Sequence, residues 1–212
     1  CFHLSYGMVY LPEGKMKSRE GKVVDADDLI EEMRLLAAQE IRARDSEGSI
    51  SEDDVNARAE KIGLGAIKFY LLRIDPKKEI HFDPQESISF DGFTGPYCQY
   101  AYARCAGILR KEEQKAEPNF SLLGNEEELQ VIRTLIQFPE VVELAAQLMD
   151  PSRVCGHIFS VAQAFNQFYN KHAVLTAESS ELASARLELV RATAQVLKNG
   201  LQLLGIDVLE VM

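Results

Sequence analysis

The sequence predicts a mainly α fold, in which a helical bundle follows a short strand-and-loop segment. Two observations support this. Apolar residues between Ala183 and Leu204 recur at alternating steps of four and three, which gives one continuous helix face for packing. Helix-start residues and prolines divide residues 96–212 into several helices, whereas aromatic and β-branched residues concentrate in positions 2–11.

The chain begins with a predicted strand and a basic loop. Residues 2–11 predict the strand, which Pro12 and Gly14 end. The loop covers residues 15–22. Asp25 then predicts the start of a helix, because acidic side chains are favoured in the first turn by the helix dipole.

A second helix is predicted to begin at Ser51, where Asp54 completes a capping pair. We expect Gly63 and Gly65 to interrupt it before it resumes and reaches Leu72. Residues 75–95 contain two prolines and several turn-forming residues, so they predict a loop with short extended pieces and the main domain boundary. Further helices are predicted over residues 97–115, 125–138, 139–150, 154–170 and 180–204.

The formal net charge of −10 and pI near 5.0 argue against broad, charge-driven binding to nucleic acid or an anionic membrane. The charge is uneven, however: residues 13–22 and the helix around Arg104 and Lys115 have a basic excess. A small contact with RNA, built on stacking, therefore remains compatible with the composition. No segment is apolar enough to predict a membrane span or a signal peptide.

The four cysteines form no Cys-x-x-Cys pair, and no histidine lies at ligand spacing from them. A chain of 212 residues buries enough apolar surface to fold without disulfides. We therefore expect buried, reduced thiols and no bound metal.

The loop Gly14–Gly21 places Lys15, Lys17 and Arg19 between two glycines. Cations on such a loop can neutralise the charge that develops on a leaving pyrophosphate. Taken alone, the same pattern also describes an ordinary solvated basic loop.

Tyr97 and Tyr100 lie three residues apart at the start of a predicted helix, and so on one helix face. Flat aromatic rings suit the stacking of unpaired bases, and one stacked base is worth about 1–3 kcal/mol. The structural alternative is that both tyrosines are rim residues of the helical core.

Two strings give these features a context. The string His3-Leu-Ser-Tyr-Gly-Met-Val9 followed by Gly14-Lys-Met-Lys-Ser-Arg-Glu-Gly21 resembles the end of the catalytic domain of arginyl-tRNA synthetases. The second stretch is similar to a variant of the class I signature Lys-Met-Ser-Lys-Ser, in which Ser18 replaces the second lysine. The resemblance implies that Lys15, Lys17 and Arg19 are catalytic and that ATP contacts Val9, Lys15 and Met16.

The string Gly95-Pro-Tyr-Cys-Gln-Tyr-Ala-Tyr-Ala-Arg104 closely resembles the start of the anticodon-binding domain of the same family. Phe165-Asn-Gln-Phe-Tyr169 and the variant signature Ala183-Ser-Ala-Arg-Leu187 are similar to later segments of that domain. The resemblance implies that tRNA contacts Tyr97, Tyr100, Arg104, Tyr169 and the terminal Met212. At Tyr169 the alignment leaves Phe168 as an alternative contact.

The resemblance implies three parts: the end of the catalytic domain in residues 1–24, a helical stem-contact region and connector in residues 25–90, and the anticodon-binding helical domain in residues 91–212. It implies an arginine–tRNA ligase that uses ATP, with Mg²⁺, and arginine and tRNA(Arg). Because the His-x-Gly-His signature is absent, we expect a fragment of a longer polypeptide that is inactive alone. We also expect a cytoplasmic monomer without membrane partners.

Two other interpretations stay open from the residues themselves. One is a non-enzymatic helical interaction scaffold, which the acidic charge and amphipathic helices fit equally well. The other is the related helical domain of another class I synthetase, such as the cysteinyl or methionyl enzyme.

Overall fold

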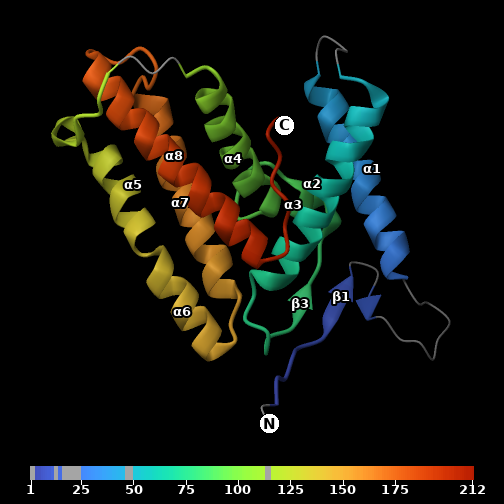
Figure 1. The fold of residues 1–212 in the computed structure, drawn as a ribbon. Coiled ribbons are helices and arrows are strands. Elements are labelled where there is room, and N and C mark those ends of the chain that lie inside the picture. The colour runs from blue at the N-terminus through green and yellow to red at the C-terminus, as the bar shows by residue number, and fades with distance from the viewer. Residues whose placement is uncertain (1–2, 12–13, 16–24, 46–49, 113–115) are drawn as a thin grey trace.

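The structure, a computed structural model, describes residues 3–11, 25–45, 50–112 and 116–212, together with the backbone of Gly14 and Lys15. Within these ranges the chain is mainly helical, and Figure 1 shows the helices as two groups above a small sheet. The long helices are α1 (Ala26–Arg44), α2 (Glu52–Leu72), α4 (Gly95–Arg110), α5 (Glu126–Ile136), α6 (Phe138–Leu148), α7 (Ser152–Lys171) and α8 (Ser180–Leu203). The short elements are β1 (Val9–Leu11), β2 (Gly14–Lys15), β3 (Ile80–His81), α3 (Pro84–Ile88) and a 3₁₀ turn at Phe120–Leu122.

The first group is the α1–α2 hairpin. Asp25 caps α1 by accepting a hydrogen bond from the Asp27 amide, and Ser51 caps α2 by accepting one from the Asp54 amide. Both predicted helix starts are therefore confirmed. The buried residues of the hairpin form one hydrophobic cluster that also receives Leu209 from the C-terminal tail.

The second group is a bundle of α4, α5, α7 and α8, with α6 following α5 and packing on α7. The predicted apolar face of α8 is confirmed, because Leu187, Val190, Leu197 and Leu201 are buried in the bundle core. Gly205, with φ at 69°, follows the end of this helix as predicted.

A buried ion pair links α5 and α8 within this bundle. Glu128 is fully buried in α5 and accepts a hydrogen bond from Arg186 Nε of α8 at 2.7 Å, while Arg186 Nη1 donates to the carbonyl of Ala173 at 2.8 Å. Glu128 also accepts from the Asn125 amide, which completes the predicted capping box. Because each charge is buried, removal of one partner leaves the other uncompensated.

The predicted break at Gly63 and Gly65 is wrong, because α2 runs through both glycines. They serve close packing between helices. A Cβ on Gly63 would lie 3.0 Å from the backbone of Met33 in α1, and one on Gly65 would lie 2.7 Å from the amide nitrogen of Gln99 in α4. The two glycines are therefore required by the close approach of neighbouring helices and not by a break in α2.

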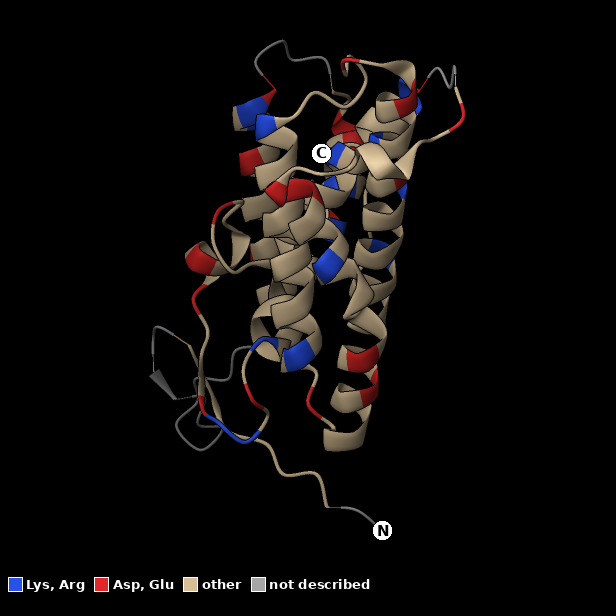
Figure 2. Cartoon of the chain, turned by 90° about the vertical axis from the view of Figure 1, so that its left-hand side faces the viewer, with Lys and Arg blue, Asp and Glu red and all other residues tan. Residues whose placement is uncertain are grey.

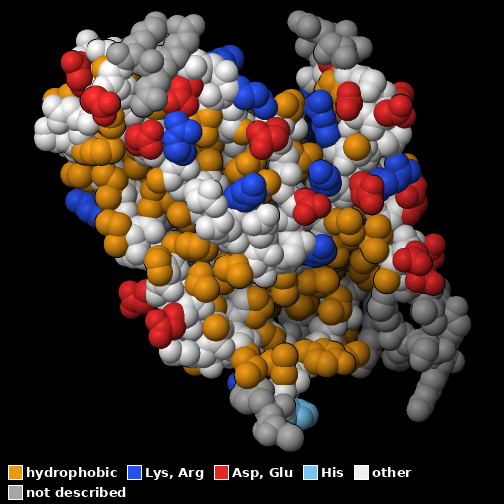
Figure 3. Space-filling model, in the orientation of Figure 1, with side chains coloured by type: hydrophobic (Ala, Val, Ile, Leu, Met, Phe, Trp, Pro, Cys, Tyr) orange, Lys and Arg blue, Asp and Glu red, His pale blue; other side chains and the backbone are white. Residues whose placement is uncertain are grey.

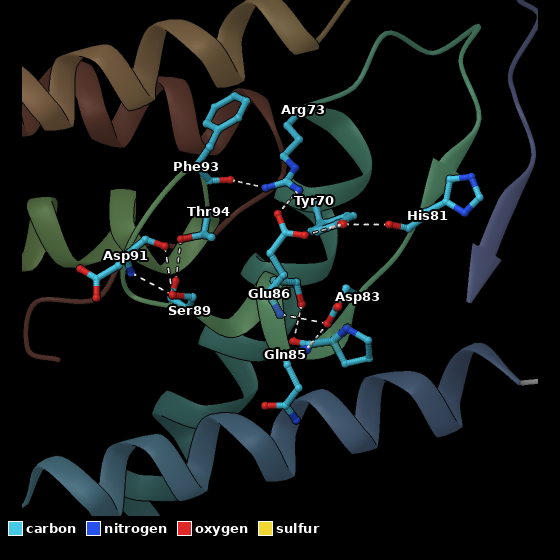
Figure 4. Close-up of polar contacts among 12 residues, drawn as sticks. Tyr70, Arg73, His81, Asp83, Gln85, Glu86, Ser89, Asp91, Phe93 and Thr94 are labelled. Atoms are coloured by element: carbon cyan, nitrogen blue, oxygen red, sulfur yellow. Dashed lines mark hydrogen bonds and ion pairs between the residues drawn. The ribbon is translucent and has the colours of Figure 1, made fainter. Parts of the chain in front are cut away.

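The connector between α2 and α4 is more ordered than predicted. The short strand β3 agrees with the predicted extended pieces, but the connector also contains the helix α3, which Asp83 caps through the amides of Gln85 and Glu86. Tyr70 donates hydrogen bonds to the His81 carbonyl and to Glu86, as Figure 4 shows. The connector is thereby fixed to the last turns of α2.

Arg73 connects this segment to α4. One guanidinium nitrogen donates to the Phe93 carbonyl at 2.6 Å and another to Glu86 at 2.6 Å (Figure 4). Thr94 then caps α4 by accepting from the Tyr97 amide. This chain of contacts fixes where α4 begins, and so where its tyrosines lie.

Two predicted boundaries need correction. The strand predicted over residues 2–11 is limited to β1, since residues 3–8 have no regular structure. In the sheet order β2-β1-β3, β1 pairs with β3 in parallel only through Val9 and Tyr10. The helix predicted over residues 97–115 ends at Arg110, because the Lys111 amide already bonds back to residues 108 and 109.

Cys98, Cys105 and Cys155 are free and buried, as predicted. Burial raises the pKa of each thiol, to about 12 for Cys155, so all three stay protonated near neutral pH. They act as small core side chains.

Candidate nucleic-acid interface

Arg104 is the centre of the predicted RNA-contacting residues. Its guanidinium carbon lies 4.8 Å from the ring centroid of Tyr100 and 5.1 Å from that of Tyr169. It also donates hydrogen bonds to Asn166 Oδ1 and, at 3.3 Å, to the Tyr100 hydroxyl. We call Tyr100, Arg104, Asn166 and Tyr169 the aromatic cluster.

Helix geometry explains how two segments far apart in sequence build this cluster. In α4, Tyr100 and Arg104 are four residues apart, and in α7, Asn166 and Tyr169 are three apart, so each pair shares one helix face. Tyr100 is 37% exposed and Tyr169 is 40% exposed, so both rings remain accessible to a ligand. The arrangement offers flat aromatic faces beside a fixed cation.

Tyr97 belongs to the same network but is less accessible. Its ring is half-buried and packs against Phe159, with the centroids 5.3 Å apart. Its hydroxyl accepts a hydrogen bond from Asn166 Nδ2 at 3.0 Å. Tyr97 therefore orients Asn166, which in turn orients Arg104.

Asn166 had no predicted role, although it lies within the Phe165–Tyr169 string. The sequence could have indicated a site role for Asn166, because it lies three residues before Tyr169 and so shares a helix face with it. Its link to Tyr97, 69 positions away, follows only from the packing of α4 on α7.

Phe168 and Tyr169, the two alternatives for the contact at this position, differ in exposure. Phe168 is fully buried in the bundle core, whereas Tyr169 lies at the surface in contact with Arg104. A stacking role at this position therefore fits Tyr169.

Two grooves adjoin the aromatic cluster. The first, the Tyr169 groove, has a volume of about 810 Å³. It is lined by residues 169–176, by Arg104, Gly107, Ile108 and Arg110 of α4, and by Lys111. The second, the Met212 groove, has a volume of about 420 Å³ and is lined by Ile41, Arg44, Asp45, Ile50, Asp54, Arg58, Ile62, Phe90, Tyr100, Val211 and Met212. Tyr100 lines the Met212 groove and Arg104 the Tyr169 groove, so the cluster joins the two.

Met212 reaches its groove because the C-terminal tail is fastened to the helices. Gln99 is fully buried and donates through Nε2 to the carbonyls of Asp207, at 2.8 Å, and Lys61, at 3.2 Å. Arg110 donates to the Glu210 carbonyl at 2.8 Å, and the Tyr102 hydroxyl donates to the Glu210 carboxylate at 3.1 Å. Burial and the Glu210 carboxylate raise the pKa of Tyr102, so its hydroxyl remains a donor.

Two of the predicted ATP and phosphate contacts, Val9 and the backbone of Lys15, belong to the small sheet. Val9 is half-buried in β1, paired with Ile80, and the backbone of Lys15 forms β2. Met16, Lys17 and Arg19 lie outside the described residues. In Figure 1 the sheet lies near the N-terminal end, and the C-terminus is beside α4 at the opposite end. Of the first predicted group, the described members Val9 and Lys15 thus lie away from the aromatic cluster.

Charges are mixed over most of the molecule: Figure 2 shows acidic and basic positions interspersed along the helices. On the face in Figure 3, basic and acidic side chains both lie around the hollow between α4 and the α1–α2 hairpin, and hydrophobic side chains dominate the lower half. Within the described ranges, no cluster of three His, Cys, Asp or Glu side chains could hold a metal, and no helix could cross a bilayer.

A family profile described as the DALR anticodon binding domain matches residues 98–212, and one for the catalytic domain of class I tRNA synthetases (R) matches residues 1–83. The first match covers more than half of the chain. The chain belongs to the DALR anticodon-binding family. Its aromatic cluster and its C-terminal tail lie within the DALR match.

Curated relatives of this DALR chain include the arginine–tRNA ligases of Treponema denticola, 45% identical over 219 residues, and Clostridium perfringens, 45% identical over 215 residues. Each alignment covers 100% of this chain and 37% of the relative. The arginyl-tRNA synthetase structure from Thermus thermophilus matches 99% of the chain with a TM-score of 0.90 at 34% identity, and 35% of that structure is covered. The chain therefore corresponds to the C-terminal region of arginyl-tRNA synthetases.

Proposed function

We propose that this chain is the tRNA(Arg)-binding C-terminal part of an arginine–tRNA ligase, and that its aromatic cluster and Met212 contact the anticodon loop. The observation that carries the proposal is the Arg104 guanidinium held against the exposed rings of Tyr100 and Tyr169. Unpaired bases stack on such rings, and an anticodon loop presents unpaired bases.

The five proposed contacts divide into direct and indirect ones. Tyr100, Arg104, Tyr169 and Met212 line the two grooves and are placed to touch RNA. Tyr97 is half-buried and bonds to Asn166, so its contribution is to orient the others.

The test is a titration of the 212-residue chain with tRNA(Arg) and with a non-cognate tRNA. Tyr100→Ala and Tyr169→Ala should each weaken binding of tRNA(Arg) by about 5- to 150-fold, which corresponds to the loss of one stacked base. Tyr6→Ala is the matched control, because Tyr6 is 85% exposed and lies outside both grooves. Equal binding by all three variants and the wild type would refute the proposal.

We further propose that residues 1–24 form the last segment of the catalytic domain of the whole ligase. That enzyme makes arginyl-tRNA from arginine, ATP and tRNA with Mg²⁺. In this proposal residues 25–90 contact the stem, and residues 91–212 form the anticodon-binding domain. Lys15, Lys17 and Arg19 are the proposed phosphate contacts, and Val9, Lys15 and Met16 border the ATP. The match of residues 1–83 to the catalytic domain profile supports the catalytic assignment, and it extends past residue 24 into the proposed stem-contact region.

The isolated chain should not activate arginine, because it spans only 37% of its relatives and lacks a His-x-Gly-His string. Arginine-dependent exchange of pyrophosphate into ATP measures this activity directly. Exchange above background by the pure chain would contradict the proposal. We also propose a cytoplasmic monomer, and sedimentation of the chain would test the oligomeric state.

A further inference from the structure

The Tyr169 groove extends well beyond the aromatic cluster. Arg110 and Lys111 lie six and seven residues after Arg104, about 10 Å further along the direction of α4 at 1.5 Å per residue. The opposite wall is the end of α7 and the residues up to Thr176. A nucleotide stacked at Tyr169 would therefore have neighbours that lie along this groove.

The charge of this groove differs from that of the chain. Its lining includes the basic side chains Arg104, Arg110, Lys111 and Lys171 together with His172, and the described residues that line it include no Asp or Glu. The chain as a whole has 33 acidic and 23 basic residues. The described lining of this groove is thus a local reversal of the net charge.

The bonding of these cations leaves several charges uncompensated. Arg110 donates to a neutral group, the Glu210 carbonyl, and Arg104 bonds to the neutral Asn166 and Tyr100. The Lys111 side chain has no hydrogen bond or ion pair with any residue in the described ranges. Lys171 is different, because Glu127 pairs with it at 2.5 Å from outside the groove.

The nearby carboxylates already have partners. Glu112 accepts two hydrogen bonds from Arg191, at 2.8 and 2.9 Å, and the Glu210 carboxylate accepts one from Tyr102. Among the described residues, no ion pair joins Glu112 or the Glu210 carboxylate to Arg110 or Lys111.

We propose that the Tyr169 groove holds the sugar–phosphate backbone of the RNA strand whose bases stack on the aromatic cluster, with Arg110 and Lys111 as phosphate contacts. This inference rests on the proposed RNA-binding function and adds a second mode of contact to it. Stacking selects unpaired bases, whereas the groove supplies the electrostatic attraction that an acidic chain otherwise lacks.

The test is the dependence of tRNA(Arg) affinity on KCl concentration. Removing the cation that neutralises one phosphate of single-stranded RNA should reduce the slope of log K against log salt by about 0.7. Lys111→Gln should show this reduction and bind about fivefold more weakly near 0.1 M salt, and the double variant with Arg110→Gln should show about twice the change in slope. Lys111→Arg should restore the slope.

The matched control is Lys198→Gln, which removes the same charge from a partly exposed position of α8 outside both grooves and outside the proposed stem-contact region. Melting temperatures equal to that of the wild type would show that the variants remain folded. An unchanged slope in Lys111→Gln and in the double variant would refute phosphate binding in the groove. That result, obtained while Tyr100→Ala still weakens binding, would leave the stacking function in place, whereas failure of both would refute the two proposals together.

Discussion

The two grooves beside Tyr100 differ in charge although they adjoin the same cluster. The Tyr169 groove is lined by cations without a carboxylate among its described residues. The Met212 groove combines Arg44 and Arg58 with Asp45 and Asp54, and its remaining lining is largely apolar. Arg44 there lies over the Phe90 ring, 4.1 Å from its centroid.

This difference leads us to assign different parts of a nucleotide to the two grooves of a chain whose net charge is −10. A groove with balanced charges and apolar walls suits a base, which is uncharged and recognised by shape and hydrogen bonds. A groove with only positive charges suits phosphates. Four predictions test this comparison, from the largest effect to the smallest.

Arg186→Ala should have the largest effect, because it removes the partner of fully buried Glu128 and the donor to Ala173 in the wall of the Tyr169 groove. Breaking a buried pair of this kind costs about 3–5 kcal/mol. Urea denaturation measures the loss. Arg191→Ala is the control, since the Arg191 side chain is about half exposed and its ion pairs should contribute at most about 1 kcal/mol. Similar losses for the two variants would contradict a special role for the buried pair.

Tyr169→Ala and Phe168→Ala should separate binding from stability. The first should weaken tRNA(Arg) binding by about 1–3 kcal/mol with little change in unfolding free energy. The second removes a fully buried ring, leaves a cavity in the core and should destabilise the fold by about 3–5 kcal/mol. Paired measurements of Kd and urea midpoint on both variants test this assignment. A reversed pattern would place the RNA contact at Phe168.

Met212→Ala should weaken tRNA(Arg) binding by about fivefold, because a half-buried methionine contributes roughly 1 kcal/mol of apolar contact. The salt dependence of binding should stay that of the wild type, since the Tyr169 groove keeps all of its charges. Lys111→Gln is expected to weaken binding by a similar factor but also to reduce the salt slope, so the slope separates the two grooves. If Met212→Ala alters the salt slope, the proposed division between the grooves is wrong.

Glu127→Gln should give the smallest effect, visible only in acid. Hydrogen bonds from Lys171 and then His172 lower the pKa of Glu127 to about 2, from an ordinary value of 4.5. A lowered pKa in the folded state means that this contribution is present above pH 4.5 and is lost as the pH falls toward 2. Wild-type melting temperature should therefore fall more than that of the variant between pH 5 and pH 3, by at most about 3 °C. Parallel melting curves would contradict this.

The sequence alone predicted most of the helices, because the signals for them are local. Capping residues such as Asp25, Ser51 and Asn125 act within one turn, and the apolar face of α8 is a repeat within one helix. The family strings likewise indicated Tyr100, Arg104 and Tyr169 before their positions were known.

Tertiary structure decided the features that depend on neighbours distant in the chain. The glycines of α2 signalled a break, yet they admit Met33 and Gln99 from other helices. The strand pairing of Val9 and Tyr10 was equally hidden, because their partners are Ile80 and His81 of β3. A local sequence pattern does not indicate which helix will pack against it.

The same limit applies to the candidate site. Residue types determined that stacking and charge were available in α4, since Tyr100 and Arg104 share a helix face by spacing alone. Only the packing of α4 on α7, and of the tail between α2 and α4, brought Asn166, Tyr169 and Met212 to them. Such contacts span tens of residues and arise from burial of whole helix faces, which no single segment of the sequence specifies.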